Sequence, residues 1–237
     1  MADETGADRE QNKRVAGEAA AAWVESGTTV GLGTGSTAIW AIRKLGALIK
    51  SGDVRDVVAV PTSRASADAA RELGIPLTTL AEVAHIDLTI DGAYEVDPDL
   101  NLVKGGGGAL LHEKIVAQAT RREVIVVDSA KPSPRLGTRH VLPIEIVPFA
   151  AAAETDFLSS LGAQVVLRVG ADGRPFVTDE ANHILDCDFG PIPDLGELDA
   201  RLHTRAGIVE HGLFLGLTAD LLVAGPNGVE HRTRPTG

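Results

Sequence analysis

The chain has 237 residues, of which 44% are hydrophobic and 23% are charged; this is the composition of a globular protein and excludes a mostly disordered or fibrous one. Its 22 Lys and Arg against 33 Asp and Glu give a net charge of −11, which argues against a nucleic-acid partner. The single cysteine excludes an internal disulfide, the polar first residues predict no signal peptide, and no apolar run reaches the ~18 residues of a membrane-spanning helix. We therefore expect a cytoplasmic protein without a membrane contact.

The first half of the chain alternates predicted strands with predicted helices. After a polar, frayed start over 1–11, helices are expected over 13–25, 36–50, 64–73 and 109–120, and strands over 28–32, 54–60, 76–79, 86–90 and 124–127. The strands are nearly continuous apolar runs, which is typical of a parallel sheet covered by helices on both faces. The pattern predicts a doubly wound, Rossmann-like α/β sheet.

The second half has a different order of elements. Strands are expected over 141–147, 164–169, 176–177 with 183–186, and 208–214, and helices over 150–161 and 194–202. The order β-α-β-β-α-β indicates a ferredoxin-like α+β unit, after which one more apolar strand follows over 219–224. We thus predict an α/β domain over 1–138 plus 215–237, with a small ferredoxin-like α+β domain over 139–214 inserted before its last strand.

A loop rich in glycine and hydroxyl groups, residues 31–37, joins the first predicted strand to the next helix. Glycines let the backbone approach a ligand, and a helix N-terminus offers free N–H groups with a partial positive charge, so the loop predicts an anion site. The alternative is a plain turn in which Ser36 or Thr37 caps the helix. Because Ser36 replaces the third glycine of the dinucleotide fingerprint, and the Gly-Lys-Ser/Thr of a P-loop is missing, we expect a phosphorylated metabolite rather than a nucleotide.

A second candidate segment spans residues 91–114. Asp91 directly follows an apolar strand, Lys104 directly precedes four glycines, and Glu113 lies about one turn into the next predicted helix. A carboxylate can remove a proton next to a carbonyl while a lysine and backbone N–H groups stabilise the oxyanion that forms. The segment therefore predicts proton-transfer chemistry, although Glu113 taken alone would be interpreted as a solvated glutamate at a helix start.

Together these blocks resemble the A-type family of ribose-5-phosphate isomerases over nearly the whole chain. The matching blocks are GTGSTA at 33–38, DGAxE at 91–95, KGGG at 104–107, EK at 113–114, DSAK at 128–131, PxExxP at 143–148 and GLF at 212–214. The resemblance implies interconversion of D-ribose 5-phosphate and D-ribulose 5-phosphate through an enediolate, in the non-oxidative pentose phosphate pathway, without metal or organic cofactor. By analogy with the family we also expect a homodimer or homotetramer.

The resemblance also assigns roles to individual residues. It implies that Glu113 is the proton-transfer base, and we expect Asp91 and Lys104 to be the other catalytic residues. The substrate contacts that it implies are Thr34, Gly35, Ser36, Thr37, Asp91, Gly92, Ala93, Tyr94, Lys104, Gly105, Gly106, Gly107 and Lys131.

One position departs from the family pattern. The family motif is Asp-Gly-Ala-Asp-Glu, and Tyr94 stands where the second aspartate belongs. A phenol with a pKa of about 10 donates hydrogen bonds at neutral pH and is a poor base. Three hypotheses stay open: an isomerase in which Asp91 covers the missing task, a weakened or non-catalytic sugar-phosphate-binding protein on the same fold, and acyl-CoA transfer with Glu113 as nucleophile.

The remaining reactive side chains are expected to be structural. The seven histidines show no metal-ligand spacing, so no metal site is predicted. Cys187 falls in a predicted strand of the small domain, where we expect it to be a buried hydrophobic residue.

Overall fold

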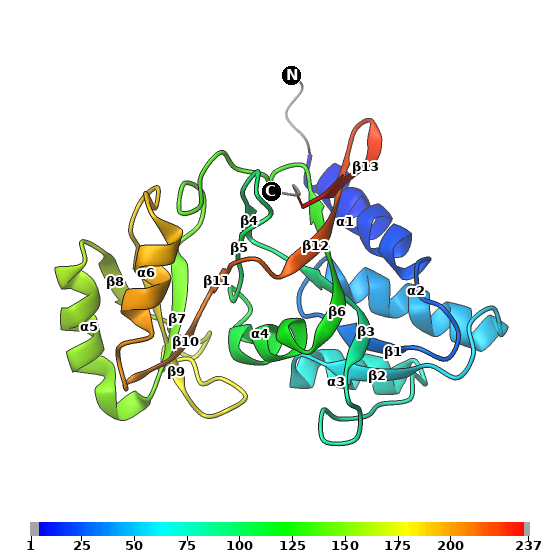
Figure 1. Cartoon of the computed structure of the whole chain (residues 1–237), viewed down its shortest axis with the longest axis horizontal. Helices are drawn as coiled ribbons and strands as arrows, with labels where there is room; N and C mark the ends of the chain where they lie inside the picture. The colour runs from blue at the N-terminus through cyan, green and yellow to red at the C-terminus, as the bar shows by residue number, and fades with distance from the viewer. Residues whose placement is uncertain (1–4, 235–237) are drawn as a thin grey trace. The chain divides into compact units, whose positions relative to one another are not determined.

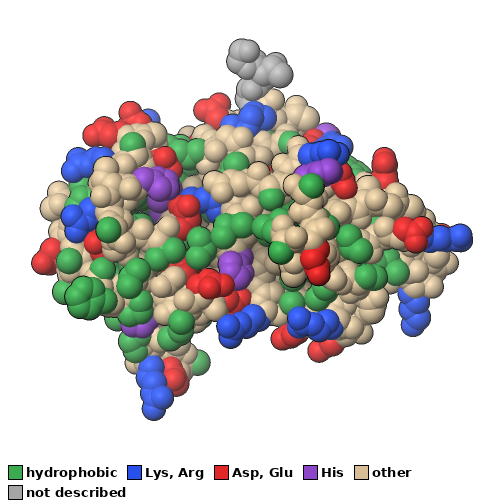
Figure 2. Space-filling view, turned by 60° about the horizontal axis from the view of Figure 1, so that its bottom comes forward, with side chains coloured by type: hydrophobic (Ala, Val, Ile, Leu, Met, Phe, Trp, Pro, Cys, Tyr) green, Lys and Arg blue, Asp and Glu red, His purple; other side chains and the backbone are tan. Residues whose placement is uncertain are grey.

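The computed structural model describes residues 5–234, which form two compact units (Figure 1). The first unit holds the chain up to residue 93, residues 112–131 and the chain from 217 onward, and the second unit holds 94–111 and 132–216. Within the described residues, no helix is both long and apolar enough to cross a membrane. On the face seen in Figure 2, acidic and basic side chains are interspersed.

The first unit is built on a six-stranded sheet with the strand order β13-β12-β6-β3-β1-β2. The strands are β1 Thr29–Leu32, β2 Val58–Pro61, β3 Ile86–Gly92, β6 Thr120–Asp128, β12 Thr218–Gly225 and β13 Gly228–Thr233. Neighbouring strands are parallel except for the hairpin of β12 and β13. The predicted parallel α/β sheet is confirmed, and β13 is an additional strand that the sequence pattern did not indicate.

Helices cover both faces of this sheet, which accounts for the buried apolar runs of β1, β6 and β12, whereas β13 is exposed along its length. The helices are α1 Gly6–Ala21, α2 Ala38–Ser51, α3 Arg64–Glu72 and α4 Leu110–Gln118. Ala59 of β2 belongs to the main core, in which α1 and α2 also pack. The next residue, Val60, points to the opposite face and packs with Val116 of α4.

The first helix begins earlier than its apolar pattern predicts. Thr5 and Asp8 form a reciprocal capping box, in which each side chain accepts a hydrogen bond from the other residue's N–H. The helix therefore spans Gly6–Ala21 rather than 13–25, and the expected frayed start is wrong for residues 6–11. The rest of that expectation, residues 1–4, lies outside the described residues.

The second unit contains a four-stranded antiparallel sheet with the strand order β10-β7-β9-β8. Its elements are β7 Leu142–Ile146, a short 3₁₀ turn Pro148–Ala150, α5 Ala151–Ser160, β8 Gln164–Leu167, β9 His183–Asp188, α6 Leu195–Leu202 and β10 Ile208–His211. This is the predicted β-α-β-β-α-β order of a ferredoxin-like unit, and the fold class is confirmed. Cys187 is buried in the core of this unit, as expected, and burial raises the pKa of its thiol.

Three short strands extend the second unit. They are β4 Glu95–Val96, β5 Leu102–Val103 and β11 Leu213–Phe214, in the order β11-β5-β4. This pairing places residues 94–111 in the second unit, to which residues 132–138 also belong. The division expected from the sequence, at 138/139 and 214/215, placed both segments in the first domain. The strand expected over 208–214 is split between two sheets. Residues 76–79 make only one isolated bridge, from Leu77 to Ala59, and 176–177 form no strand.

Candidate active site

The loop after β1 lies against the end of β3. These two strands are parallel neighbours, so the loop and Asp91 meet at the carboxyl edge of the sheet. The Thr34 N–H donates to Asp91 Oδ1 at 3.1 Å, and the Gly92 N–H donates to the same atom at 2.7 Å. A Cβ at Gly33 would lie 2.2 Å from that oxygen, so only glycine allows this approach. The fully buried Asp91 is thus fixed by backbone donors at the end of a rigid strand, with Ala93 just beyond it.

Hydroxyl groups from the neighbouring strand surround Thr34. Its Oγ1 lies 2.8 Å from Thr62 Oγ1 and donates to Ser63 Oγ at 2.7 Å. Thr62 and Ser63 directly follow β2, which pairs with β1, and Ser63 also caps helix α3. The sequence analysis missed these two hydroxyl groups, although a Thr-Ser pair after a buried strand was the available signal.

The rest of the loop leads into α2. Thr37 occupies the N-cap position, but its side chain makes no capping hydrogen bond, and Ser36 is exposed. This disfavours a turn capped by a Ser36 or Thr37 side chain. The Ile39 N–H donates to the Gly35 carbonyl and the Trp40 N–H to the Thr37 carbonyl, both at 3.1 Å, so an anion at this loop would be bound by the N–H groups that precede Ile39. A cavity of about 280 Å³ adjoins the loop and is lined by Gly33, Thr34, Gly35, Ile39, Ile42, Ala65 and Ser66.

Glu113 and Lys131 are the other candidate residues of the first unit. Glu113 lies in the first turn of α4 and is only 4% exposed, so it is not a solvated glutamate. Lys131 is half-buried just after β6, where Asp128 turns the chain by accepting the Ala130 N–H at 2.9 Å.

In the second unit, Lys104 follows β5 and precedes the glycines 105–108. Its side chain is 2% exposed, its Nζ lies 5.5 Å from the centroid of the Phe214 ring, and its N–H donates to the Gly212 carbonyl at 2.9 Å. Burying an ammonium group costs free energy unless it is paired, so a lysine held at this depth indicates a role in a site rather than at the surface.

Tyr94 lies over the glycine loop of the second unit. A Cβ at Gly106 would be 2.2 Å from the phenol ring, so the ring and the loop backbone are in direct contact. The ring also makes an edge contact with His140, whose ring centroid is 4.5 Å away, and the Tyr94 N–H donates to the Val103 carbonyl at 2.9 Å. The Tyr94 ring therefore packs between the loop backbone and His140, a neighbour that the sequence analysis did not single out.

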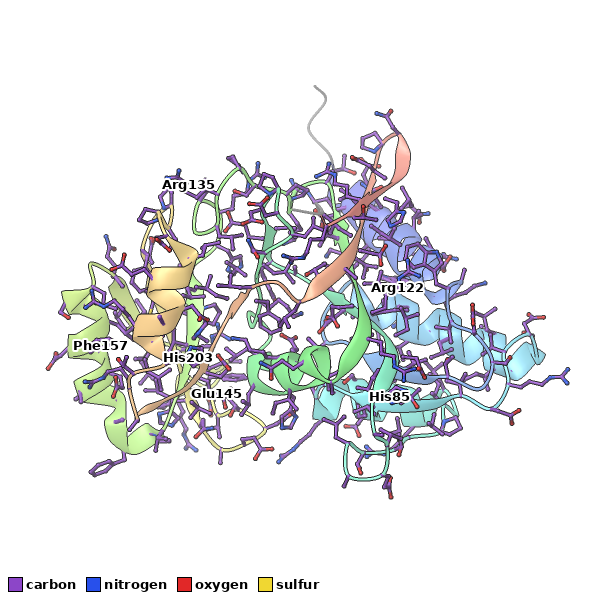
Figure 3. The ribbon with its side chains drawn as sticks, viewed as in Figure 1. His85, Arg122, Arg135, Glu145, Phe157 and His203 are labelled. Atoms are coloured by element: carbon purple, nitrogen blue, oxygen red, sulfur yellow. The ribbon has the colours of Figure 1, made fainter. Side chains whose placement is uncertain are left out.

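One group of histidines and acids does come together, on α6 and β10 of the second unit (Figure 3 labels His203). Donor atoms of Asp199, His203 and His211 lie within 4.8 Å of one another. The Leu213 N–H donates to His211 Nδ1 at 3.3 Å, which places the ring proton on Nε2, the atom that a metal would need. That nitrogen instead faces Asp199 Oδ1 at 3.2 Å. The Nε2 proton of His211 thus faces a carboxylate rather than an open metal position.

The predicted site residues therefore lie in two groups. The first unit carries Thr34, Gly35, Ser36, Thr37, Asp91, Gly92, Ala93, Glu113 and Lys131, and the second carries Tyr94, Lys104, Gly105, Gly106 and Gly107. The first group offers buried carboxylates and a loop before a helix, and the second offers a buried lysine before a glycine loop. These are the types of group that an enzyme uses to move protons on a small anionic substrate.

The chain belongs to the ribose 5-phosphate isomerase A (phosphoriboisomerase A) family, whose model matches residues 58–228. It is 57% identical over 224 residues to the ribose-5-phosphate isomerase A of Chloroflexus aurantiacus, covering 94% of each chain. It is 55% identical to that of Desulfatibacillum aliphaticivorans, covering 92% of this chain and 94% of the relative.

Solved structures agree with this assignment. A D-ribose-5-phosphate isomerase in complex with phospho-erythronic acid superposes with a TM-score of 0.93 at 37% identity, covering 95% of this chain and 99% of that one. The ribose 5-phosphate isomerase of Plasmodium falciparum gives a TM-score of 0.92 at 38% identity, covering 96% of this chain and 100% of the other.

Proposed function

We propose that this protein interconverts D-ribose 5-phosphate and D-ribulose 5-phosphate, the aldose–ketose step of the non-oxidative pentose phosphate pathway. The observation that carries the proposal is the buried, helix-start Glu113 in a chain whose likeness to the isomerases covers nearly its whole length. Neither a non-catalytic binding role nor acyl-CoA transfer has support from the relatives.

The chemistry that we assign to the site is proton transfer between two neighbouring carbons. The Glu113 carboxylate removes the proton from C2 of the open-chain aldose, and the electron pair moves into an enediolate. Lys104 and the backbone N–H groups of Gly105–Gly107 stabilise the negative charge on its oxygen. The hydroxyl proton on O2 moves to O1, so that the carbonyl forms at C2. Protonated Glu113 then returns its proton to C1, which gives the ketose and restores the carboxylate.

Phosphate binding is assigned to the loop before α2. Ser36, Thr37 and the loop N–H groups that precede Ile39 supply donors, as a helix N-terminus does for phosphate in other folds. Lys131 adds a positive charge. The phospho-erythronic acid in a solved relative supports a phosphorylated ligand of this size.

Sugar-ring opening is assigned to Asp91, because Tyr94 replaces the second aspartate of the family motif. The fixed Asp91 carboxylate can accept a hydroxyl proton, whereas the Tyr94 phenol ring packs against the backbone of Gly106. We also propose a cytoplasmic homodimer or homotetramer, as the family resemblance implies.

The test is turnover of ribose 5-phosphate by the purified protein, followed as ribulose 5-phosphate by NMR in D₂O. Proton transfer through a base incorporates solvent deuterium at C1 of the ketose, whereas a hydride shift would not. We expect Glu113→Gln to lower kcat by about 10²–10⁴-fold with little change in KM. Glu197→Gln, at an exposed first-turn glutamate of α6, is the matched control and should leave kcat unchanged. Glu113→Gln retaining more than about a tenth of kcat would remove Glu113 from the role.

A further inference from the structure

Arg168 binds the glycine loop of the second unit, which is also closed by a hydrogen bond from the Gly108 N–H to the Gly105 carbonyl at 3.0 Å. Arg168 directly follows β8, and its Nη1 donates to the carbonyls of Gly105 at 2.9 Å and Gly106 at 3.1 Å. Its side chain is 14% exposed, so these hydrogen bonds are largely shielded from water. The two carbonyls are bound by one charged donor group, which is stronger than a neutral donor.

The guanidinium group is itself fixed from two further sides. Asp186 of β9 binds it through both carboxylate oxygens, at 2.9 Å from Nε and by a short bond from Nη2. The Phe176 ring lies 5.8 Å from the guanidinium carbon and also touches the loop, because a Cβ at Gly108 would be 2.4 Å from that ring. The two hydrogen bonds to Asp186 and the contact with the Phe176 ring fix the guanidinium group in one orientation.

This orientation decides where the loop's amides point. In a trans peptide the C=O and the following N–H point in opposite directions. Because the carbonyls of Gly105 and Gly106 point at Arg168, the N–H groups of Gly106 and Gly107 point away from it, side by side. Within residues 5–234, neither of these N–H groups makes a hydrogen bond in the structure. They form a pair of backbone donors directed at whatever lies across the loop from Arg168.

We propose that Arg168 is a positioning residue of the isomerase, which orients the Gly106 and Gly107 N–H groups as donors to the substrate's oxyanion. This inference rests on the proposed function. Its charge also polarises the two peptide groups, since a carbonyl that accepts a charged hydrogen bond makes the N–H of the same peptide a stronger donor. Asp186 holds Arg168 in place by accepting two hydrogen bonds from it.

The test compares Arg168→Lys and Arg168→Ala with Arg174→Ala, which removes an exposed arginine of the same unit. Lysine keeps the charge but cannot bind Asp186 and two carbonyls at once. We expect both Arg168 variants to lose about 10- to 100-fold in kcat, because misplaced oxyanion donors act in the transition state, with KM changed less than about threefold. Arg174→Ala should behave as wild type.

Chemical rescue separates positioning from simple stability. Millimolar methylguanidinium should restore part of kcat in Arg168→Ala, where it can occupy the vacated position, but not in Arg168→Lys; sodium chloride at equal ionic strength is the control. If kcat stays within twofold of wild type in folded variants, the proposal is overturned. It is also overturned if the loss only follows the folded fraction measured by circular dichroism and no rescue occurs. Should Arg168→Ala fail to fold, kcat of folded Arg168→Lys decides. Failure of the proposed function would show separately, as an inactive wild type.

Discussion

Glu95 offers a prediction whose size can be worked out from the structure. It is the acidic residue that ends the Asp-Gly-Ala-x-Glu block, yet its carboxylate is fully buried and serves the backbone. Oε2 accepts the Gly137 N–H at 3.0 Å, and Oε1 accepts the N–H groups of Thr138 and Arg139, both at 3.2 Å. Three backbone donors converge on one charge, so Glu95 holds the segment that precedes His140.

Glu95→Gln keeps the shape and removes the charge. Its amide NH₂ group must face at least one N–H donor, so one hydrogen bond is lost and the others become neutral. Charged hydrogen bonds contribute roughly 1.5–3 kcal/mol and neutral ones roughly 0.5–1.5 kcal/mol. Allowing for the smaller cost of burying a neutral group, we expect a loss of about 2–4 kcal/mol in unfolding free energy. At about 2–4 °C per kcal/mol for a chain of this size, the unfolding midpoint should fall by about 5–15 °C.

The measurement is thermal unfolding by calorimetry, with kcat measured well below the midpoint. Glu72→Gln, at an exposed glutamate of α3, is the control and should move the midpoint by less than about 2 °C. We expect the folded Glu95→Gln protein to keep its kcat within a few-fold. A midpoint shift as small as that of the control would refute the hydrogen-bond accounting, and an unshifted midpoint with a large loss of kcat would assign Glu95 to the chemistry.

Two further predictions follow from other side chains. Tyr94→Phe should leave kcat within about threefold, because the ring packs against Gly106 and its hydroxyl is not needed. Tyr94→Asp should speed only the reaction of cyclic substrate, if ring opening limits the rate. A large loss of kcat in Tyr94→Phe, measured in the same NMR assay, would contradict a packing role. For Asp220, burial alone would raise the pKa, but hydrogen bonds from Arg122 and His231 outweigh it and hold the pKa below its ordinary value. Its stabilising effect is therefore full above about pH 4 and is lost as the pH falls through the lowered pKa, so unfolding midpoints of wild type and Asp220→Asn should converge in acid; a constant difference from pH 6 to pH 2 would contradict it.

The parallel sheet was predictable because strands that are buried on both faces carry apolar residues at successive positions. The first helix was mispredicted for the converse reason, since residues 6–11 are polar and the helix begins through the capping box of Thr5 and Asp8. Short strands such as β4 and β5 carry too few residues to show a period, so the sequence could not show that 94–111 pack with the second unit.

Candidate site residues were predictable where one strand end determines them. Asp91 and the loop before α2 follow neighbouring parallel strands, and such ends meet at one edge of a sheet. Thr62 and Ser63 follow the same rule on β2, but recognising them required knowing that β2 lies beside β1. Chain order alone does not give strand order.

Arg168 marks the limit of what local pattern can reveal. It lies 62 and 63 residues from the carbonyls that it binds, and in sequence it does not differ from an exposed arginine such as Arg174. Its position depends on the register of β8 and β9, in which Leu167 pairs with Leu185 and so brings Arg168 beside Asp186. A slip of one residue would turn Asp186 to the other face of the sheet and leave the guanidinium group without its carboxylate. The register of β8 and β9 in the ferredoxin-like sheet therefore fixes the position of Arg168, and through Arg168 the direction of the loop's N–H groups.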